Sequence, residues 1–134
     1  MAMLELKDVT ISYKGIPAVR DIHMKLDEGG ICGIVGESGS GKTTVIRAIL
    51  GLLPGGGRVT KGDILFDGES LPGKSKEEWR KLRGSEISMI FQDSGAMMNP
   101  TRRIGSCFVE YIRTHEKISK KEAWDKGVMM LERM

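Results

Sequence analysis

Apolar and polar side chains alternate near the start of the chain with the period of two that is typical of half-buried strands. This alternation predicts two strands, joined by a turn over residues 14–17, where glycine and proline interrupt the pattern. The first strand is predicted to be of the edge type, with one irregularity at Asp8. Its apolar positions are Leu4, Leu6, Val9 and Ile11, and those of the second strand are Val19, Ile22, Met24 and Leu26.

Three more strands are predicted from shorter apolar runs. Residues 31–35 (ICGIV) form a run that is typical of a buried strand, and residues 87–91 predict a further strand that ends at Gln92. Residues 63–66 predict a strand that Asp67-Gly68 turns into a hairpin, because this dipeptide favours the left-handed angles of a tight turn.

Helical periodicity predicts four helices. One runs from Thr43 to Leu53 and is stopped by the cluster at residues 54–57 (PGGG). Ser-x-x-Glu capping boxes open two others, one of which runs from Ser75 through Arg83. The predicted apolar faces are Val45, Ile46, Ile49, Leu50 and Leu53 in the first helix, Ile104, Phe108, Tyr111 and Ile112 in the third, and Ala123, Trp124, Val128 and Leu131 in the fourth, which Ser119 and Glu122 cap.

The sequence GESGSGKTT at residues 36–44 is the strongest chemical signal, since it fits the phosphate-binding pattern G-x-x-x-x-G-K-[ST] between a predicted strand and a predicted helix. Its glycines allow successive N–H groups to surround an anion, and the helix N-terminus adds further donors. This context disfavours a glycine-rich turn that binds nothing. The predicted phosphate-binding residues are Gly36, Ser38, Gly39, Ser40, Gly41, Lys42, Thr43 and Thr44, with Thr43 as a Mg²⁺ ligand.

Composition narrows the class of protein further. The 134 residues suit one small domain, and 40% apolar residues can supply a core. A formal charge of +3, with basic residues spread along the chain, gives no reason to expect a nucleic-acid partner. No signal peptide or membrane span is evident. Cys32 and Cys107 are expected to be reduced core thiols, and His23 and His115 to be solvated or structural.

The order of motifs resembles that of a known family. Tyr13 lies in the strand-rich segment before the GKTT sequence, and Phe-Gln-Asp with Gln92, then Asn99-Pro100, follows about 50 residues after it. This order, over essentially the whole chain, resembles the ATP-binding subunit of ABC transporters, and most of all the oligopeptide/dipeptide/nickel importer branch. The resemblance implies an α/β P-loop NTPase fold, present as a partial core with an antiparallel β subdomain and the start of a helical subdomain.

The same resemblance assigns roles to single residues. Tyr13 is implied to stack on the adenine of ATP, and Gln92 to contact Mg²⁺ or the attacking water, so that Lys42 and Gln92 carry the catalytic roles. The alternatives are that Tyr13 packs locally in a hairpin and that Gln92 is a polar residue at a strand end. The implied parts of the single ATPase domain are 1–30 and 58–72 (β subdomain), 31–57 and 84–93 (P-loop core) and 94–134 (start of the helical subdomain).

The resemblance also implies partners and a location. We expect the parent to work with transmembrane permease subunits and a second ATPase subunit at the cytoplasmic face of the membrane, with the uptake of peptide or metal-type cargo driven by ATP hydrolysis. The family signature Leu-Ser-Gly-Gly-Gln and an apolar run followed by Asp-Glu are both absent from the 134 residues. Asp67 is no substitute, since the Gly68 after it marks a hairpin.

The sequence ends at Met134 inside a predicted helix, so we expect the first half of an ATPase subunit, with negligible turnover of its own. A fragment that binds nucleotide without turnover, and another P-loop enzyme such as a small kinase, remain the alternatives. In the family, the strands at residues 31–35 and 87–91 are not neighbours, so both would present unpaired edges. Such edges favour pairing with another chain, and self-association is therefore expected.

Overall fold

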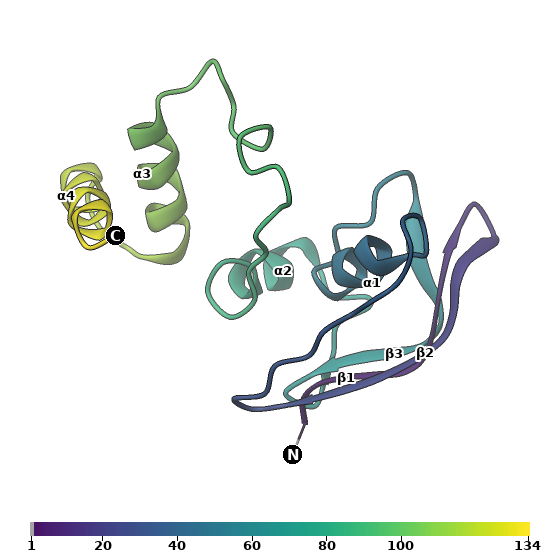
Figure 1. The fold of residues 1–134 in the computed structure, drawn as a ribbon. Coiled ribbons are helices and arrows are strands. Elements are labelled where there is room, and N and C mark those ends of the chain that lie inside the picture. The colour runs from purple at the N-terminus through teal and green to yellow at the C-terminus, as the bar shows by residue number, and fades with distance from the viewer. Residues whose placement is uncertain (1) are drawn as a thin grey trace. The chain divides into compact units, whose positions relative to one another are not determined.

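The computed structural model describes residues 2–134, and the chain divides into two compact units, Met1–Arg83 and Gly84–Met134. Figure 1 follows the chain through both units, and each has its own secondary structure. The first unit contains all the strands together with α1 (Lys42–Ile49) and α2 (Lys76–Leu82). The second unit contains α3 (Ile104–His115) and α4 (Lys120–Glu132).

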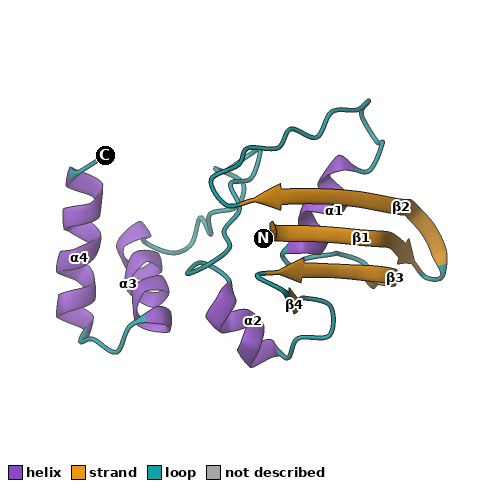
Figure 2. Ribbon diagram, turned by 90° about the horizontal axis from the view of Figure 1, so that it is seen from below, coloured by secondary structure: helices purple, strands orange, loops and turns teal. Residues whose placement is uncertain are grey.

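A four-stranded antiparallel sheet is the framework of the first unit (Figure 2). Its strands are β1 (Ala2–Tyr13), β2 (Ile16–Asp27), β3 (Gly57–Phe66) and β4 (Glu69–Ser70), in the order β2-β1-β3-β4. The two predicted N-terminal strands and the Asp67-Gly68 hairpin are confirmed. The prediction that the first strand lies at an edge is wrong, because β3 returns after α1 and pairs with the second side of β1.

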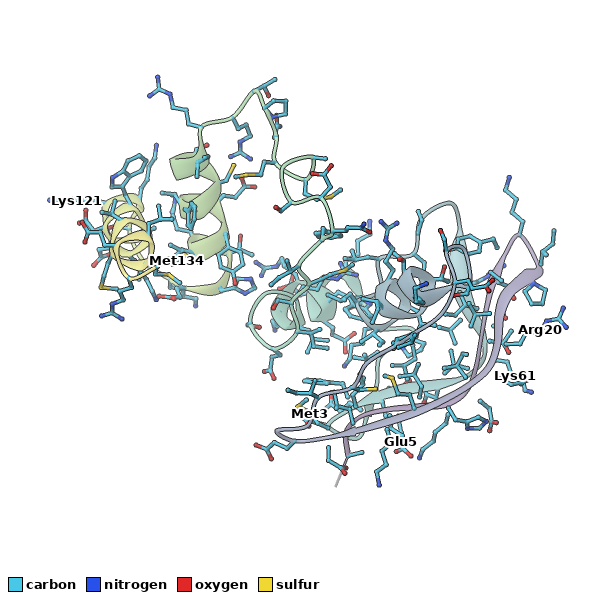
Figure 3. The ribbon with its side chains drawn as sticks, in the orientation of Figure 1. Met3, Glu5, Arg20, Lys61, Lys121 and Met134 are labelled. Atoms are coloured by element: carbon cyan, nitrogen blue, oxygen red, sulfur yellow. The ribbon has the colours of Figure 1, made fainter. Side chains whose placement is uncertain are left out.

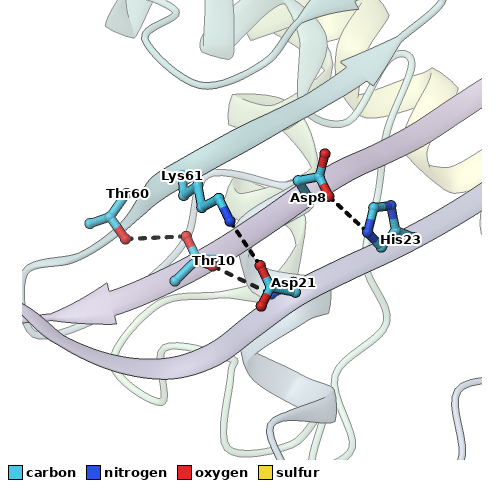
Figure 4. Close-up of polar contacts among 6 residues, drawn as sticks. All are labelled: Asp8, Thr10, Asp21, His23, Thr60 and Lys61. Atoms are coloured by element: carbon cyan, nitrogen blue, oxygen red, sulfur yellow. Dashed lines mark hydrogen bonds and ion pairs between the residues drawn. The ribbon is translucent and has the colours of Figure 1, made fainter.

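Two aspartates mark irregularities in the β1–β2 pair. Asp8 and Asp21 have φ angles of 48° and 49°, in the left-handed region that aspartate adopts more readily than most residues. The Asp21 N–H donates to the Thr10 hydroxyl at 3.4 Å, and its carboxylate pairs with Lys61 at 3.0 Å (Figure 4). Asp8 pairs with His23 at 2.8 Å. The predicted irregularity at Asp8 is confirmed, and His23 has a structural role.

The core of the first unit lies between the sheet and α1, which covers one face of the strands (Figure 2). Side chains on the other face, such as Glu5 and Lys61, point away from α1 (Figure 3). Burial of the apolar face is the main favourable contribution to folding. The buried apolar side chains of this unit are Leu4, Leu6, Val9, Ile11, Val19, Val45, Ala48, Ile49, Leu50, Ile64 and Leu71.

Both helices of the first unit form where the pattern predicts them, with one difference in length. The Ser75–Glu78 capping box is present at the start of α2, so this prediction is confirmed. By contrast, α1 ends at Ile49 rather than Leu53. The helix stops earlier because Gly51 has a φ of 64°, a left-handed angle that closes a helix before the PGGG cluster is reached.

A helical hairpin contains the helices of the second unit. α3 and α4 pack around Val109, Ile112 and Ala123, and α4 opens with the predicted Ser119–Glu122 capping box. The prediction that Trp124, Val128 and Leu131 point inward is wrong, since they are 52%, 43% and 51% exposed. They line an open apolar hollow of about 250 Å³ between the two helices, whose α3 side is formed by Ile104, Gly105 and Phe108.

The two apolar runs predicted as core strands do not form strands. Residues 31–35 have no regular structure, and Ile31 and Val35 are almost fully exposed. Residues 88–91 are irregular as well, and Ile90 is 94% exposed. A strand needs neighbours to accept its backbone hydrogen bonds, and no strand of residues 2–134 pairs with either run. The two edges expected to drive self-association are therefore absent as strands, and self-association itself stays a prediction.

The same exposure changes the prediction for one of the cysteines. Cys32 lies in the first irregular run and is exposed, so its predicted burial is wrong, whereas Cys107 on α3 is partly buried. Both thiols are free, as predicted. In the part of the chain that the structure describes, no helix has the length and apolar character needed to cross a membrane.

Candidate nucleotide-binding site

The predicted phosphate-binding loop is an exposed turn that leads directly into α1. Residues 36–40 are all exposed, and the Ser40 N–H donates to the Glu37 carbonyl at 3.1 Å to close the turn. Gly41 then takes a φ of 98° as the N-cap of α1 and provides no side-chain cap. The first N–H groups of a helix have no partner within the helix, so those of α1 can donate to an anion at this end.

Lys42 lies over the loop rather than pointing into solvent. Its ammonium donates to the Gly36 carbonyl at 2.5 Å and to the Glu37 carbonyl at 2.6 Å. An ammonium has three donors, so these two bonds leave capacity for a phosphate oxygen. The positive charge is thus held at the mouth of the loop, beside the positive end of the α1 dipole. Both features favour a polyanionic ligand.

The loop is fitted closely to the sheet at Gly41. A Cβ atom at this position would lie 2.6 Å from Cγ2 of Val19, a buried residue of β2, which is too close for any side chain. Val19 therefore fixes how far the loop stands from the sheet. The alternation of the sequence predicts Val19 in a strand, but nothing local in the sequence indicates its contact with the site.

The two threonines after Lys42 lie in the first turn of α1, as predicted. Thr43 is exposed, so its hydroxyl is accessible to a ligand, and Thr44 is half-buried. Residues 2–134 contain no cluster of three His, Cys, Asp or Glu side chains that could hold a metal ion. A P-loop Mg²⁺ needs no such cluster, because a Ser or Thr hydroxyl and the nucleotide oxygens are among its main ligands. The residues present therefore fit ATP with Mg²⁺.

The two remaining predicted site residues lie in different units. Tyr13 ends β1, opposite Ile16 and Gly57. Its ring covers Gly57, where a Cβ atom would lie 2.4 Å from the ring, so the local packing left open as an alternative does occur. Gln92 is exposed and lies in an irregular segment of the second unit. Its role at the nucleotide stays a prediction.

The first unit also has an open hollow, which is separate from the loop. It measures about 340 Å³ and lies beside the C-terminal end of α1, where Gly51, Leu71 and Trp79 are among its lining residues. No residue from 36 to 44 lines it. The chemistry of the loop is that of an open surface, and we place the candidate site there rather than in the larger hollow.

Comparison with known proteins decides the family. A family model described as ABC transporter matches residues 19–130, which includes the loop, α1 and most of α4. The chain belongs to the ABC transporter family. The kinase alternative is thereby excluded, and the resemblance drawn from Tyr13, the GKTT sequence and Gln92 is confirmed at the level of the family.

Curated relatives support the importer branch of this ABC transporter family. The oligopeptide transport ATP-binding protein OppD of Bacillus subtilis is 43% identical over 97% of this chain and 38% of its own length. OppD of Escherichia coli is 38% identical over 98% of this chain and 40% of its own length. The dipeptide transport ATP-binding protein DppD of Lactococcus lactis is 36% identical over 98% of this chain and 39% of its own length. The chain thus spans about two fifths of the length of these relatives.

Solved structures confirm the fold class. A nucleotide-free ATP-binding cassette from an ABC transporter matches with a TM-score of 0.51 at 24% identity, over 60% of this chain and 30% of that one. A cassette in its ADP conformation matches with a TM-score of 0.50 at 26% identity, over the same shares. The α/β fold of this chain is therefore that of a partial ATP-binding cassette, as predicted.

Proposed function

We propose that the chain binds the phosphates of ATP at the loop formed by residues 36–44. The observation that carries this proposal is the arrangement at the start of α1. Gly41 caps the helix without a side chain, and Lys42 lies across the same loop. N–H donors, the helix dipole and an ammonium charge thus converge on one exposed turn, a combination suited to a polyphosphate.

The remaining nucleotide contacts are assigned by family resemblance. In this proposal the Thr43 hydroxyl holds Mg²⁺, and Thr44 adds a hydroxyl to the phosphate shell. Tyr13 stacks on the adenine, and this base–aromatic contact contributes to the affinity for ATP. Gln92 contacts Mg²⁺ or the attacking water. Of these roles, that of Tyr13 requires its ring to leave or share its contact with Gly57.

We further propose that the parent subunit uses ATP hydrolysis to drive the uptake of peptides. The support is the naming of the relatives, which are ATP-binding proteins of oligopeptide and dipeptide transport. Permease subunits in the membrane and a second ATPase subunit are then the partners, and the cytoplasmic face of the membrane is the location. Metal-type cargo has no support among these relatives.

The 134-residue chain alone is expected to turn over ATP negligibly. Hydrolysis requires a positioned water and stabilisation of the transition state. The family's signature sequence and its Asp-Glu pair, which supply these functions, are absent from the chain. A phosphate-release rate of about 1 s⁻¹ or more, typical of an ordinary enzyme, that disappears in Lys42→Ala would contradict this expectation.

Calorimetric titration with a non-hydrolysable ATP analogue and Mg²⁺ tests the binding proposal. Removal of the Lys42 charge should raise the Kd at least tenfold, on the order of one lost charge-assisted hydrogen bond. Lys61→Ala is the matched control, because this lysine is exposed on the sheet and pairs with Asp21. Equal affinity of the wild type and Lys42→Ala, or no binding by the wild type, would overturn the proposal.

A further inference from the structure

The C-terminal end of α1 has its own set of hydrogen bonds. Gly51 follows the C-cap Leu50, and its N–H donates to the Ala48 carbonyl at 3.1 Å. The Leu52 N–H donates to the Arg47 carbonyl at 2.9 Å, which completes a Schellman motif. These two bonds satisfy the carbonyls of Arg47 and Ala48 but not those of Leu50 and Gly51.

Arg83, the residue that follows α2, supplies the missing donors. Its Nε donates to the Leu50 carbonyl at 2.7 Å, and its Nη2 donates to the Gly51 carbonyl at 2.9 Å. The guanidinium lies 4.6 Å from the centre of the Trp79 ring, in a cation–π contact. A Cβ atom on Gly51 would lie 2.6 Å from that ring, so only glycine leaves room for this cluster. The cation also complements the negative end of the α1 dipole.

The two ends of α1 are therefore held by different contacts. Val19 limits the position of Gly41 at the N-terminal end, and Arg83 holds the C-terminal end. With eight residues, α1 is too short to be stable or to keep a direction without tertiary contacts. The direction of its first N–H groups, which face the phosphate loop, thus depends on both contacts.

We propose that Arg83 is a positioning residue for nucleotide binding, which fixes the axis of α1 from the end opposite the phosphates. This inference rests on the proposed phosphate site. Arg83 does not touch the nucleotide, since α1 spans about 12 Å at 1.5 Å per residue. Its loss tilts or frays α1 and misdirects the N–H groups. The expected signature is a weaker affinity in a chain that remains fully folded.

Calorimetry with Mg²⁺ and a non-hydrolysable ATP analogue can measure affinity and stoichiometry together. Arg83→Gln should raise the Kd about tenfold at unchanged stoichiometry, and Arg83→Lys about threefold, because lysine keeps the charge but loses the two-pronged geometry. Arg80→Gln is the matched control, as it makes the same chemical change on α2, where the guanidinium pairs with Glu77 at 2.7 Å. Its Kd should equal that of the wild type.

The outcomes separate this inference from the site on which it rests. If Lys42→Ala weakens binding but Arg83→Gln binds like the wild type, the positioning role is wrong and the phosphate site stands. Lower stoichiometry at an unchanged Kd shows that Arg83 supports folding only, which also overturns the inference. If circular dichroism shows Arg83→Gln to be unfolded, the Kd of Arg83→Lys decides. A wild-type chain without affinity for the analogue defeats both proposals.

Discussion

Two neighbouring segments with similar apolar sequences, one inside the sheet and one that follows it in the chain, have different structures. β2 and residues 31–35 are both apolar enough to predict strands, and only a short turn separates them. β2 pairs along its length with β1, whereas residues 31–35 pair with nothing that the structure describes and are exposed. An apolar run predicts a tendency, but the strand forms only where a neighbour accepts its hydrogen bonds.

The phosphate loop has a defined shape, unlike residues 31–35, which precede it in the chain. Its shape is set by the left-handed Gly41, by the turn that Ser40 closes and by the bonds of Lys42 to the loop carbonyls. These contacts span only a few residues, and Val19 adds one from the sheet. The turn that forms the loop is therefore held mainly by local contacts, and it exists beside a segment that has no regular structure.

The largest expected difference between the sheet and residues 31–35 is in how much side-chain packing contributes to the free energy of unfolding. Ile64 in β3 is fully buried, so Ile64→Ala should lower the free energy of unfolding by about 2–5 kcal/mol, the cost of a large-to-small change in a core. Val35→Ala is the matched change in the exposed run, where Val35 is 96% exposed, and should alter stability by less than about 0.5 kcal/mol. Urea unfolding of both variants measures this, and equal losses would mean that residues 31–35 are packed in solution.

A smaller difference in stability is expected between alanine substitutions at two glycines, one on either side of the start of the loop. Gly41→Ala should destabilise the chain by at least about 1–2 kcal/mol, because φ is 98° and Val19 lies in the way, and should also abolish nucleotide binding. Gly33 has open space around it, so Gly33→Ala should change neither property. Thermal melting and calorimetry test the pair. Retained binding in Gly41→Ala would show that the loop does not need its left-handed N-cap.

The smallest expected loss of stability comes from the capping box of α2, which also depends on residues close in sequence. Ser75→Ala should cost about 1 kcal/mol, as for other helix caps. The Ser75 N–H, and then its hydroxyl, hold the pKa of Glu78 below the ordinary value of 4.5. This stabilisation is complete above pH 4.5 and is lost as the pH falls through the lower pKa of the folded state.

Urea unfolding at pH 7 and at about pH 3 measures the capping effect, with the exposed Ser94→Ala as control. Because alanine keeps the N–H that bonds the Glu78 carboxylate, only the lesser hydroxyl contribution to the lowered pKa is removed. The loss caused by Ser75→Ala should therefore be slightly larger at pH 7, where Glu78 is ionised in the folded and unfolded chain, and a loss that grows on acidification would contradict the contribution of the hydroxyl.

Local chemistry explains which parts of the structure could be predicted. Both capping boxes, the Asp67-Gly68 hairpin and the loop residues from Gly36 to Thr44 depend on neighbours in sequence, and all lie in the predicted kind of element. The position of β1 inside the sheet, the exposure of Trp124 and the contact of Val19 with Gly41 depend on elements distant in sequence. Periodicity gives no information about which partner covers an apolar face.

Binding of phosphate by residues 38–44 can be followed residue by residue through amide NMR shifts during titration with Mg²⁺ and a non-hydrolysable ATP analogue. We expect the largest shifts at the N–H groups of residues 38–44, and in Lys42→Ala the same shifts should need about tenfold more analogue or still higher concentrations to develop. Shifts centred elsewhere, for example at the hollow beside Trp79, would contradict it, as would a titration in which Lys42→Ala behaves like the wild type.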